Sequence, residues 1–486
     1  MGFNVKSQRM KIALVEPPKD FWFVMGKYIS PPFGLLCLAG YLEKNMPETE
    51  ITIIDSQSEG LDWDGLENRL FELQPDVVAS SSLATANAYY ALRVCQMVKK
   101  INSDTKTVLG GQHFTALANE TISKYPEVDF IIRGEGEETF TDLVKCIEQD
   151  NGVDRVLGLS YKKEKINHNP DRPLIGNLDV LPPPAYHLVA EHMKNYYFSL
   201  MSDESLPFAI IEGSRGCRHN CSYCSQWCFW RRNQRFKSPE NVVKEFERLY
   251  YEYGSRFFWF ADDNFGLDDR TESICDLLIQ RGLGDEIQWF CQLRADDIVV
   301  HSETISKLRQ AGAIWALVGF DNSSQEILRS FRRFDLNNDT CKKAVDLLRE
   351  NQIFSQGTFI VGHPNDNHES IDSLREYADQ LDPDIASFFA LTPFPGTEIY
   401  KEAKEKGWIM DTNWANYDMV HAIMPTNHLS REEVQKELYE CYNHFFGSWP
   451  RRYRGILSDN PVTRRTYGYL AKQSILSNLK DLIGKR

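Results

Sequence analysis

Three cysteines with metal-ligand spacing lie near the middle of the chain, where Cys217, Cys221 and Cys224 form the pattern C-x3-C-x2-C. Thiolates are soft ligands, and several in one loop are typical of iron–sulfur clusters. Three of them can hold three irons of a [4Fe–4S] cluster and leave the fourth iron open to a small molecule. The alternative is structural zinc, which usually has four protein ligands. Structural zinc usually takes its ligands from two separate pairs, whereas here Cys228 or His219 would have to be the fourth ligand. The spacing therefore favours the cluster.

The elements that must position this loop are predicted to be strand–helix units. The segment before the cysteines, 208–212, is an apolar run typical of a buried strand, and helical patterns such as 239–251 separate it from five further runs. These runs are 257–261, 288–293, 314–319, 357–361 and 386–391. Six such units predict a partial (β/α)6 barrel over residues 200–404, with its chemistry at the C-terminal ends of the strands.

The first part of the chain also alternates strands and helices. Such alternation predicts a doubly wound parallel sheet of the Rossmann type, which binds ligands at the carboxyl ends of its strands. We therefore expect an α/β domain with its linker over residues 1–180. Residues 405–486 are expected to be mainly helical, with a helix over 430–446 that begins at a capping box. The strands predicted in the first domain are 12–15, 51–55, 77–82, 107–111 and 130–133.

The overall composition narrows the class of protein. The formal net charge is -14, which argues against nucleic acid as a partner, since proteins that bind it concentrate Lys and Arg. Hydrophobic residues make up 42% of the chain, which is enough for large buried cores. No run approaches the roughly 18 apolar residues of a membrane span, and the N-terminus lacks a secretory pattern. We therefore expect a cytoplasmic protein without a membrane span.

The cysteine loop resembles the signature of the radical S-adenosylmethionine (SAM) superfamily, in which an aromatic residue, here Tyr223, precedes the last cysteine. The resemblance implies that SAM binds the open iron and is cleaved to methionine and a 5′-deoxyadenosyl radical, with electrons from an external donor. Segment 319–323 resembles the family's G-x-E-S stretch, with Asp321 in place of Glu, and 359–362 resembles the segment that packs on adenine. The SAM-binding residues implied in this way are Tyr223, Asp262, Asp263, Gln292, Arg294, Asp321, Ile360 and Val361.

The first domain resembles the cobalamin-binding domain of the cobalamin-dependent branch of that superfamily. The likeness is carried by segments 31–36, 110–113 and 133–137. Glycines that follow a strand, such as those in the second segment, allow close backbone approach to a ligand. The residues implied to hold cobalamin are Ser80, Ser81, Ser82, Thr85, Gly110, Gly111, Gln112, His113, Gly134 and Glu135. The expected loop has no D-x-H-x-x-G histidine to bind cobalt. Aromatic residues after the first strand could cover a cobalt face instead, namely Phe21, Trp22, Phe23 and Tyr28.

Segments 221–231 and 281–289 narrow the resemblance to the group of the anaerobic magnesium-protoporphyrin monomethyl ester oxidative cyclase. This group contains cyclases and also methyltransferases, one of which modifies a glutamine of a protein. The resemblance implies a methyltransferase that abstracts hydrogen from an unactivated sp3 carbon with the 5′-deoxyadenosyl radical and transfers a methyl group from methylcobalamin. An oxidative cyclase acting on a tetrapyrrole is the alternative, and a non-catalytic sensor is a third interpretation. The substrate can be a protein, a peptide or a small molecule, and we predict no acid–base catalytic residue.

Overall fold

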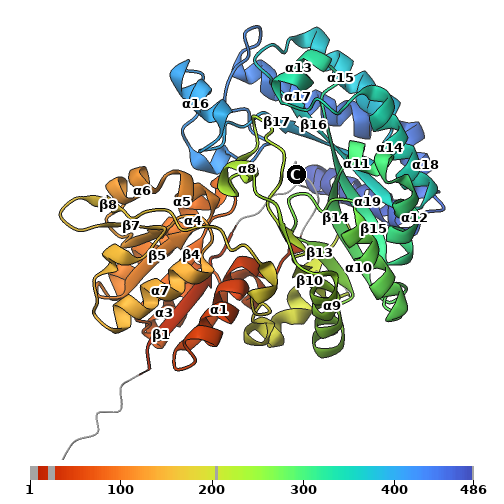
Figure 1. Ribbon diagram of the computed structural model, residues 1–486. Coiled ribbons are helices and arrows are strands. Elements are labelled where there is room, and N and C mark those ends of the chain that lie inside the picture. The colour runs from red at the N-terminus through yellow and green to blue at the C-terminus, as the bar shows by residue number, and fades with distance from the viewer. Residues whose placement is uncertain (1–8, 20–27, 203–205, 484–486) are drawn as a thin grey trace, which may run out of the picture.

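Two parallel β-sheets dominate the protein, which we describe from a computed structural model (Figure 1). The structure describes residues 9–19, 28–202 and 206–483. The N-terminal sheet and its helices lie beside the second sheet, and the C-terminal helices pack on that second sheet (Figure 1). Within the described residues, no helix has both the length and the apolar character needed to cross a bilayer.

The first sheet has seven strands in the order β3-β1-β4-β5-β6-β7-β8. Strands β1, β3, β4, β5 and β6 are parallel and correspond to the five strands predicted from the sequence. Strands β7 and β8 extend the sheet as an antiparallel hairpin that we did not predict, because both are short and polar. The strands are β1 (Lys11–Glu16), β3 (Glu50–Asp55), β4 (Val77–Ser81), β5 (Lys106–Gly110), β6 (Phe130–Ile132), β7 (Leu159–Lys162) and β8 (Ile166–His168).

Helices cover both faces of this sheet, as in a doubly wound fold. Ile12 and Leu14 of β1 share a core with α1 and α7, whereas Ala13 and Val15 pack with α3 and α4. The core on the α1 and α7 side continues into the second sheet, so the two sheets share one hydrophobic core. The helices are α1 (Phe33–Asn45), α2 (Ser56–Glu59), α3 (Trp63–Leu73), α4 (Ala88–Ile101), α5 (Gln112–Ala116), α6 (Ala118–Lys124) and α7 (Glu137–Glu148).

The second sheet is open and parallel, in the order β10-β13-β14-β15-β16-β17. It confirms the predicted partial (β/α)6 barrel. Its strands are buried on both faces, which explains why they read as continuous apolar runs. The strands are β10 (Phe208–Ile211), β13 (Phe257–Phe260), β14 (Gln288–Arg294), β15 (Ala313–Asp321), β16 (Phe354–Val361) and β17 (Ile385–Ala390). The helices are α9 (Pro239–Tyr253), α10 (Asp269–Gln280), α11 (Ala295–Val300), α12 (Ser302–Gln310), α13 (Gln325–Ser330), α14 (Asn338–Glu350), α15 (His368–Leu381) and α16 (Glu398–Glu405).

Two short antiparallel ribbons tie loops to this frame. The strand β2 (Tyr28–Ile29) pairs with β9 (Tyr197–Phe198), which joins the segment after β1 to the linker between the sheets. The strand β11 (Ser214–Arg215) pairs with β12 (Arg235–Phe236). This second ribbon closes the loop that carries the three cysteines, and the short helix α8 (Ser225–Phe229) lies within that loop.

The C-terminal region is mainly helical, as predicted, and consists of α17 (Arg431–Gly447), α18 (Trp449–Ile456) and α19 (Pro461–Ile483). The predicted capping box is confirmed at the start of α17. Ser430 Oγ accepts from the Glu433 N–H, and the Glu433 carboxylate accepts from the Ser430 N–H.

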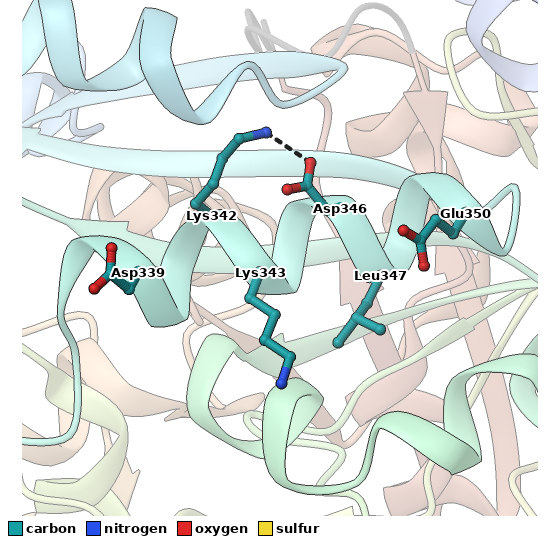
Figure 2. Close-up of a pocket in the computed structure, with 6 residues that line it drawn as sticks. All are labelled: Asp339, Lys342, Lys343, Asp346, Leu347 and Glu350. Carbon is teal, nitrogen blue, oxygen red and sulfur yellow. Dashed lines mark hydrogen bonds and ion pairs between the residues drawn. The ribbon is translucent and has the colours of Figure 1, made fainter.

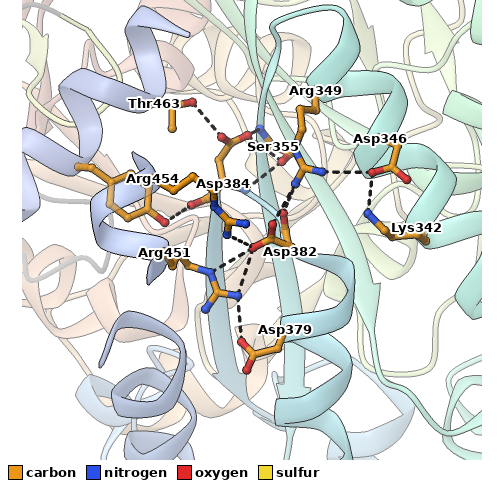
Figure 3. Close-up of polar contacts among 11 residues, drawn as sticks. Lys342, Asp346, Arg349, Ser355, Asp379, Asp382, Asp384, Arg451, Arg454 and Thr463 are labelled. Carbon is orange, nitrogen blue, oxygen red and sulfur yellow. Dashed lines mark hydrogen bonds and ion pairs between the residues drawn. The ribbon is translucent and has the colours of Figure 1, made fainter. Parts of the chain in front are cut away.

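Carboxylates of the barrel hold the last two helices in place (Figure 3). Arg451 and Arg454 of α18 donate to Asp382 Oδ1 over 3.2 and 2.9 Å. Thr463 Oγ1 of α19 donates to Asp384 Oδ1 over 2.8 Å. The C-terminal helices are thus part of the barrel's own packing.

Candidate functional site

A cavity of about 240 Å³ lies at the carboxyl ends of the barrel strands, where this fold places its chemistry. Cys217, Cys221 and Cys224 all line it. Six of the residues predicted to bind SAM line it as well: Tyr223, Asp263, Gln292, Arg294, Asp321 and Ile360. The other two, Asp262 and Val361, are fully buried and do not border it. The tertiary fold therefore brings together the cysteines and most of the predicted SAM-binding residues.

The cysteine loop has a tight base at Gly216. This residue has φ +87, and a Cβ there would lie 2.1 Å from the Asn233 carbonyl oxygen. Any other residue would force apart the two ends of the loop, which the β11–β12 ribbon holds together. Glycine is required here because the chain must turn from the strand into the cysteine motif within one residue.

Burial favours the protonated thiol form of two of the three cysteines. Burial raises the pKa of Cys217, and it raises the pKa of Cys224 to about 12. Positive charge from iron would stabilise their thiolate forms. In the described part of the chain, no three His, Cys, Asp or Glu side chains converge on a point for one metal ion. Thiolates of a [4Fe–4S] cluster bind different irons, so a cluster does not require such convergence.

Tyr223 and Asp321 join the cysteine loop to strand β15. Tyr223 Oη donates to Asp321 Oδ2 over 2.9 Å, and Arg333 Nε forms an ion pair with the same oxygen at 2.9 Å. Arg333 Nη2 also donates to the Gly319 carbonyl over 2.7 Å. Asp321 has φ +60 and lies where the β15–β16 register shifts. Its carboxylate is occupied by protein partners, so Asp321 anchors the cysteine loop. It does this with a shorter side chain than the Glu of the family's G-x-E-S stretch.

The adjacent acids Asp262 and Asp263 have different roles. Asp262 Oδ1 accepts from the Gly213 N–H over 2.8 Å, and Asp262 Oδ2 accepts from Ser214 Oγ over 2.6 Å. It therefore supports the start of the cysteine loop. Asp263 lines the cavity, and burial together with the neighbouring Asp262 raises its pKa to about 7. Of the two predicted SAM contacts, only Asp263 is placed to meet a ligand in the cavity.

Sequence reasoning missed several residues of the cavity wall. Arg333 and Thr358 add polar groups, and Thr358 follows the same strand-end rule that identified Gln292. Met419 comes from the segment after α16, its carbonyl accepts from the Ala390 N–H over 2.8 Å, and its φ is +67. No local pattern signals Met419, because only the tertiary fold brings it to the barrel. The remaining cavity residues that we did not predict include Asn264, Leu293, Leu317, Phe389 and Leu391.

The carboxyl edge of the first sheet has the features of a ligand cradle. Ser80 is buried, and its hydroxyl has no hydrogen-bond partner among the described residues. Gly111 has φ +94, and a Cβ there would lie 2.4 Å from the Ser82 carbonyl oxygen. A Cβ on Gly134, with φ +78, would enter open space. An unpaired buried hydroxyl and open space at Gly134 suit a ligand that approaches the strand ends.

Three predicted cobalamin-binding side chains of segments 110–113 and 133–137 have protein partners. Gln112 contacts Gln226 and Ser225, directly after the last cysteine. His113 Nδ1 lies 3.4 Å from Thr85 Oγ1, and burial lowers the pKa of His113 to about 4. The third is Glu135, whose carboxylate binds arginines of the cysteine loop. The contacts of Gln112 and Glu135 join the first sheet to the cysteine loop, whereas that of His113 stays within the first domain. The roles of these residues toward cobalamin remain predictions.

The loop predicted to cover cobalt is described only in part. Phe21, Trp22 and Phe23 lie outside the described residues. The Tyr28 ring stacks on Phe198, with ring centroids 4.9 Å apart, in the β2–β9 ribbon. Burial raises the pKa of the Tyr28 hydroxyl well above its ordinary value. Tyr28 therefore helps to tie its loop to the linker, and a place beside cobalt stays a prediction.

A second hollow lies on the outer face of α14, away from the cysteines (Figure 2). Its lining carries charges of both signs, and Lys342 Nζ lies 2.6 Å from Asp346 Oδ1. Both side chains are more than 40% exposed. Mixed charges on an exposed helix face are typical of a solvated surface. We assign no function to this hollow.

Comparison with known families agrees with the two-sheet architecture. The family model of the B12 binding domain matches residues 24–144, and that of the radical SAM superfamily matches residues 211–378. An uncharacterized methyltransferase of Pyrococcus horikoshii is 32% identical over 445 residues, which cover 90% of this chain and 92% of the relative. The chain belongs to the cobalamin-dependent radical SAM family.

Within this family, the relatives differ in reaction. The anaerobic magnesium-protoporphyrin IX monomethyl ester cyclase of Cereibacter sphaeroides is 31% identical over 421 residues, which cover 86% of this chain and 67% of the cyclase. The radical SAM methyltransferase TsrM of Kitasatospora setae, solved with cobalamin and a [4Fe–4S] cluster, has a TM-score of 0.71. It shares 17% sequence identity, and the match covers 89% of this chain and 91% of TsrM. The fold of this radical SAM protein is therefore that of TsrM, and its cofactors are cobalamin, a [4Fe–4S] cluster and SAM.

The residues of this radical SAM protein fit those cofactors. The three thiolates suit the cluster, and the cavity beside them offers polar groups from Asp263, Gln292 and Arg294 to SAM. The unpaired Ser80 hydroxyl and the glycine-lined strand ends suit cobalamin at the first sheet.

Proposed function

We propose that this protein is a C-methyltransferase that acts on an unactivated sp3 carbon. One contact carries the proposal: Gln112, the first residue of α5, meets Ser225 and Gln226, which follow the last cysteine. This contact supports a single reaction space. In it, the carboxyl edge of the first sheet and the cysteine loop of the barrel face the same substrate. A methyltransferase needs both groups at one carbon, because hydrogen removal and methyl delivery must follow each other there.

The bound cofactors supply a 5′-deoxyadenosyl radical and a methyl group, and the protein's part is placement. Apolar side chains of the cavity wall, among them Leu317, Phe389 and Met419, keep water from a radical. Arg294 is buried and held by Asp296 Oδ1 at 3.0 Å, so its guanidinium is pre-oriented beside the cysteines. No proton transfer by a side chain is required for hydrogen abstraction, and we assign none.

The finer substrate assignment rests on the sequence. A glutamine side chain of a protein is one substrate consistent with the resemblance to the cyclase group. The buried guanidinium groups of Arg294 and Arg333 could meet the amide or backbone carbonyls of such a peptide.

Oxidative cyclisation of a tetrapyrrole is the second candidate reaction. The 31% identity to the Cereibacter sphaeroides cyclase over most of this chain favours it. The same radical chemistry would begin both reactions, and they differ in whether a methyl group reaches the product.

Isotope transfer under anaerobic conditions tests the proposal. The reconstituted protein is incubated with cobalamin, a low-potential reductant and methyl-labelled SAM, with either a pool of glutamine-containing peptides or magnesium-protoporphyrin monomethyl ester. A methyltransferase forms 5′-deoxyadenosine and adds label to a peptide. Formation of a new ring in the porphyrin without label would contradict methylation and support the cyclase. A variant with all three cysteines replaced by Ala is the control and should form neither product.

A further inference from the structure

A buried ionic cluster lies where the two cofactor-binding halves meet. Glu135 comes from the loop after β6 in the first sheet, and Glu137 is the first residue of α7. Arg215 and Arg235 come from the β11–β12 ribbon at the base of the cysteine loop. All four side chains are at most 7% exposed. Charges are rarely placed so far from water unless they are paired, so this arrangement constrains both halves.

Glu135 is the centre of the cluster. Arg215 Nη1 donates to Glu135 Oε1 over 2.9 Å, and Arg235 Nη1 contacts both Glu135 oxygens at 2.9 Å. The Ile175 N–H donates to Glu135 Oε2 over 2.8 Å. One carboxylate thus binds both arginines of the ribbon, which would otherwise repel each other as paired neighbours on adjacent strands.

The two arginines are fixed further by other partners. Arg215 Nη2 donates to Glu137 Oε1 over 2.6 Å, and Arg215 Nε donates to Glu212 Oε1 over 2.8 Å. Arg235 Nη1 donates to the Ile175 carbonyl over 2.7 Å. Burial opposes the charge of Arg215, but the carboxylates of Glu137 and Glu212 hold its pKa well above the ordinary value.

The position of these arginines connects them to the iron site. Arg215 lies two residues before Cys217, and between them stands Gly216, the glycine that cannot carry a Cβ. Arg235 closes the other end of the same loop through the β11–β12 ribbon. A shift of either arginine must therefore move the loop that presents the three thiolates.

We propose that Glu135 is a positioning residue that holds the cysteine loop, through Arg215 and Arg235, in register with the cobalamin domain. In this role Glu135 does not touch cobalamin, although its sequence context led us to predict that contact. The role is the same for methylation and for cyclisation, so it does not depend on which reaction the protein performs.

The test compares Glu135→Gln with a matched variant in holoprotein reconstituted with iron, sulfide and cobalamin. Glu437→Gln is the match, because Glu437 is also buried and pairs with Arg375 Nη1 at 2.7 Å between α15 and α17. The readouts are iron content, the dissociation constants of labelled SAM and of cobalamin by equilibrium dialysis, and hydrogen exchange of residues 216–234. The electron paramagnetic resonance spectrum of the reduced cluster with SAM is recorded as well.

Glu135→Gln should retain iron but weaken SAM binding about tenfold, because the loop loses its fixed position. Hydrogen exchange over 216–234 should become faster and the cluster spectrum with SAM should broaden, while cobalamin affinity changes by less than about twofold. Glu135→Asp, which keeps the charge, should recover part of the SAM affinity. Glu437→Gln should leave SAM affinity and loop exchange as in the wild type.

Two results with Glu135→Gln would overturn the proposal. Weaker cobalamin binding with unchanged SAM affinity and loop exchange would make Glu135 a cobalamin-binding residue. Equal effects of Glu135→Gln and Glu437→Gln would show a general loss of stability. If Glu135→Gln does not fold, Glu137→Gln removes one partner of Arg215 and leaves Glu135 in place. It should show the same changes to a smaller extent, and a wild-type profile in Glu137→Gln would also overturn the proposal.

Discussion

Tyr223 Oη lies 2.9 Å from Asp321 Oδ2, although the two residues are 98 positions apart in the chain. Tyr223 stands between two of the cysteines, and Asp321 ends strand β15. The hydrogen bond therefore fixes the cysteine loop to the rim of the barrel. Arg333 completes the arrangement by pairing with the same carboxylate, so all three groups depend on one another.

Replacing Asp321 by Ala should destabilise the protein strongly. The Arg333 guanidinium would remain buried without its charge partner, which costs about 3–5 kcal/mol. Tyr223→Phe removes one hydroxyl and should cost only about 1 kcal/mol. Thermal unfolding of the two reconstituted variants measures the difference. A larger loss of stability in Tyr223→Phe than in Asp321→Ala would contradict this account of the site.

Gly216→Ala should abolish cluster assembly. The added Cβ would lie 2.1 Å from the Asn233 carbonyl oxygen, so the loop must open at its base. Gly254→Ala is the matched control, because Gly254 also has a positive φ, +68, but a Cβ there meets nothing within 4 Å. The control should lose about 1 kcal/mol of stability, because alanine is disfavoured in the left-handed conformation, and keep its iron. The iron content of both variants is measured after anaerobic reconstitution. Full iron content in Gly216→Ala would refute the prediction.

Single replacement of Cys217, Cys221 or Cys224 by Ala should remove the visible absorbance and most of the iron of the reconstituted protein. Cys228→Ala is the control, since its sulfur is not expected to bind iron. Cys228 Sγ instead lies 3.9 Å from the Cys224 carbonyl oxygen, within α8. Iron loss in Cys228→Ala comparable to that in the other variants would point to a fourth protein ligand and weaken the case for an open iron.

Asp55 should make the stability of the protein depend on pH. Burial, with Glu16 nearby, raises its pKa from 3.8 to about 6, although Tyr196 Oη donates to it over 2.9 Å. The folded state therefore holds this proton more tightly than the unfolded state, so the carboxylate lowers stability as pH rises through about 4 to 6. Asp55→Asn removes this dependence.

Relative to the wild type, Asp55→Asn should gain about 1 kcal/mol between pH 5 and pH 7.5. Thermal unfolding midpoints of both proteins at the two pH values measure the gain. A difference between variant and wild type that stays constant with pH would show that the carboxyl titrates normally.

The amino-acid sequence alone predicted the cofactors and the order of the elements. The spacing of Cys217, Cys221 and Cys224 depends only on local sequence, and thiolates so close together restrict what they can bind. The parallel strands were predictable because their burial on both faces leaves continuous apolar runs. The capping box at Ser430 was predictable for the same local reason, since both partners lie within one helical turn.

The tertiary structure was needed to separate the predicted residues that line the cavity from those that hold the protein together. Asp262 and Asp263 are neighbours in the chain, yet one supports the cysteine loop and the other lines the cavity. Glu135 stands in a glycine-rich loop that suggests a ligand, but its carboxylate binds two arginines from the other sheet. Such roles depend on contacts between residues far apart in the chain, and these form only when both sheets have folded.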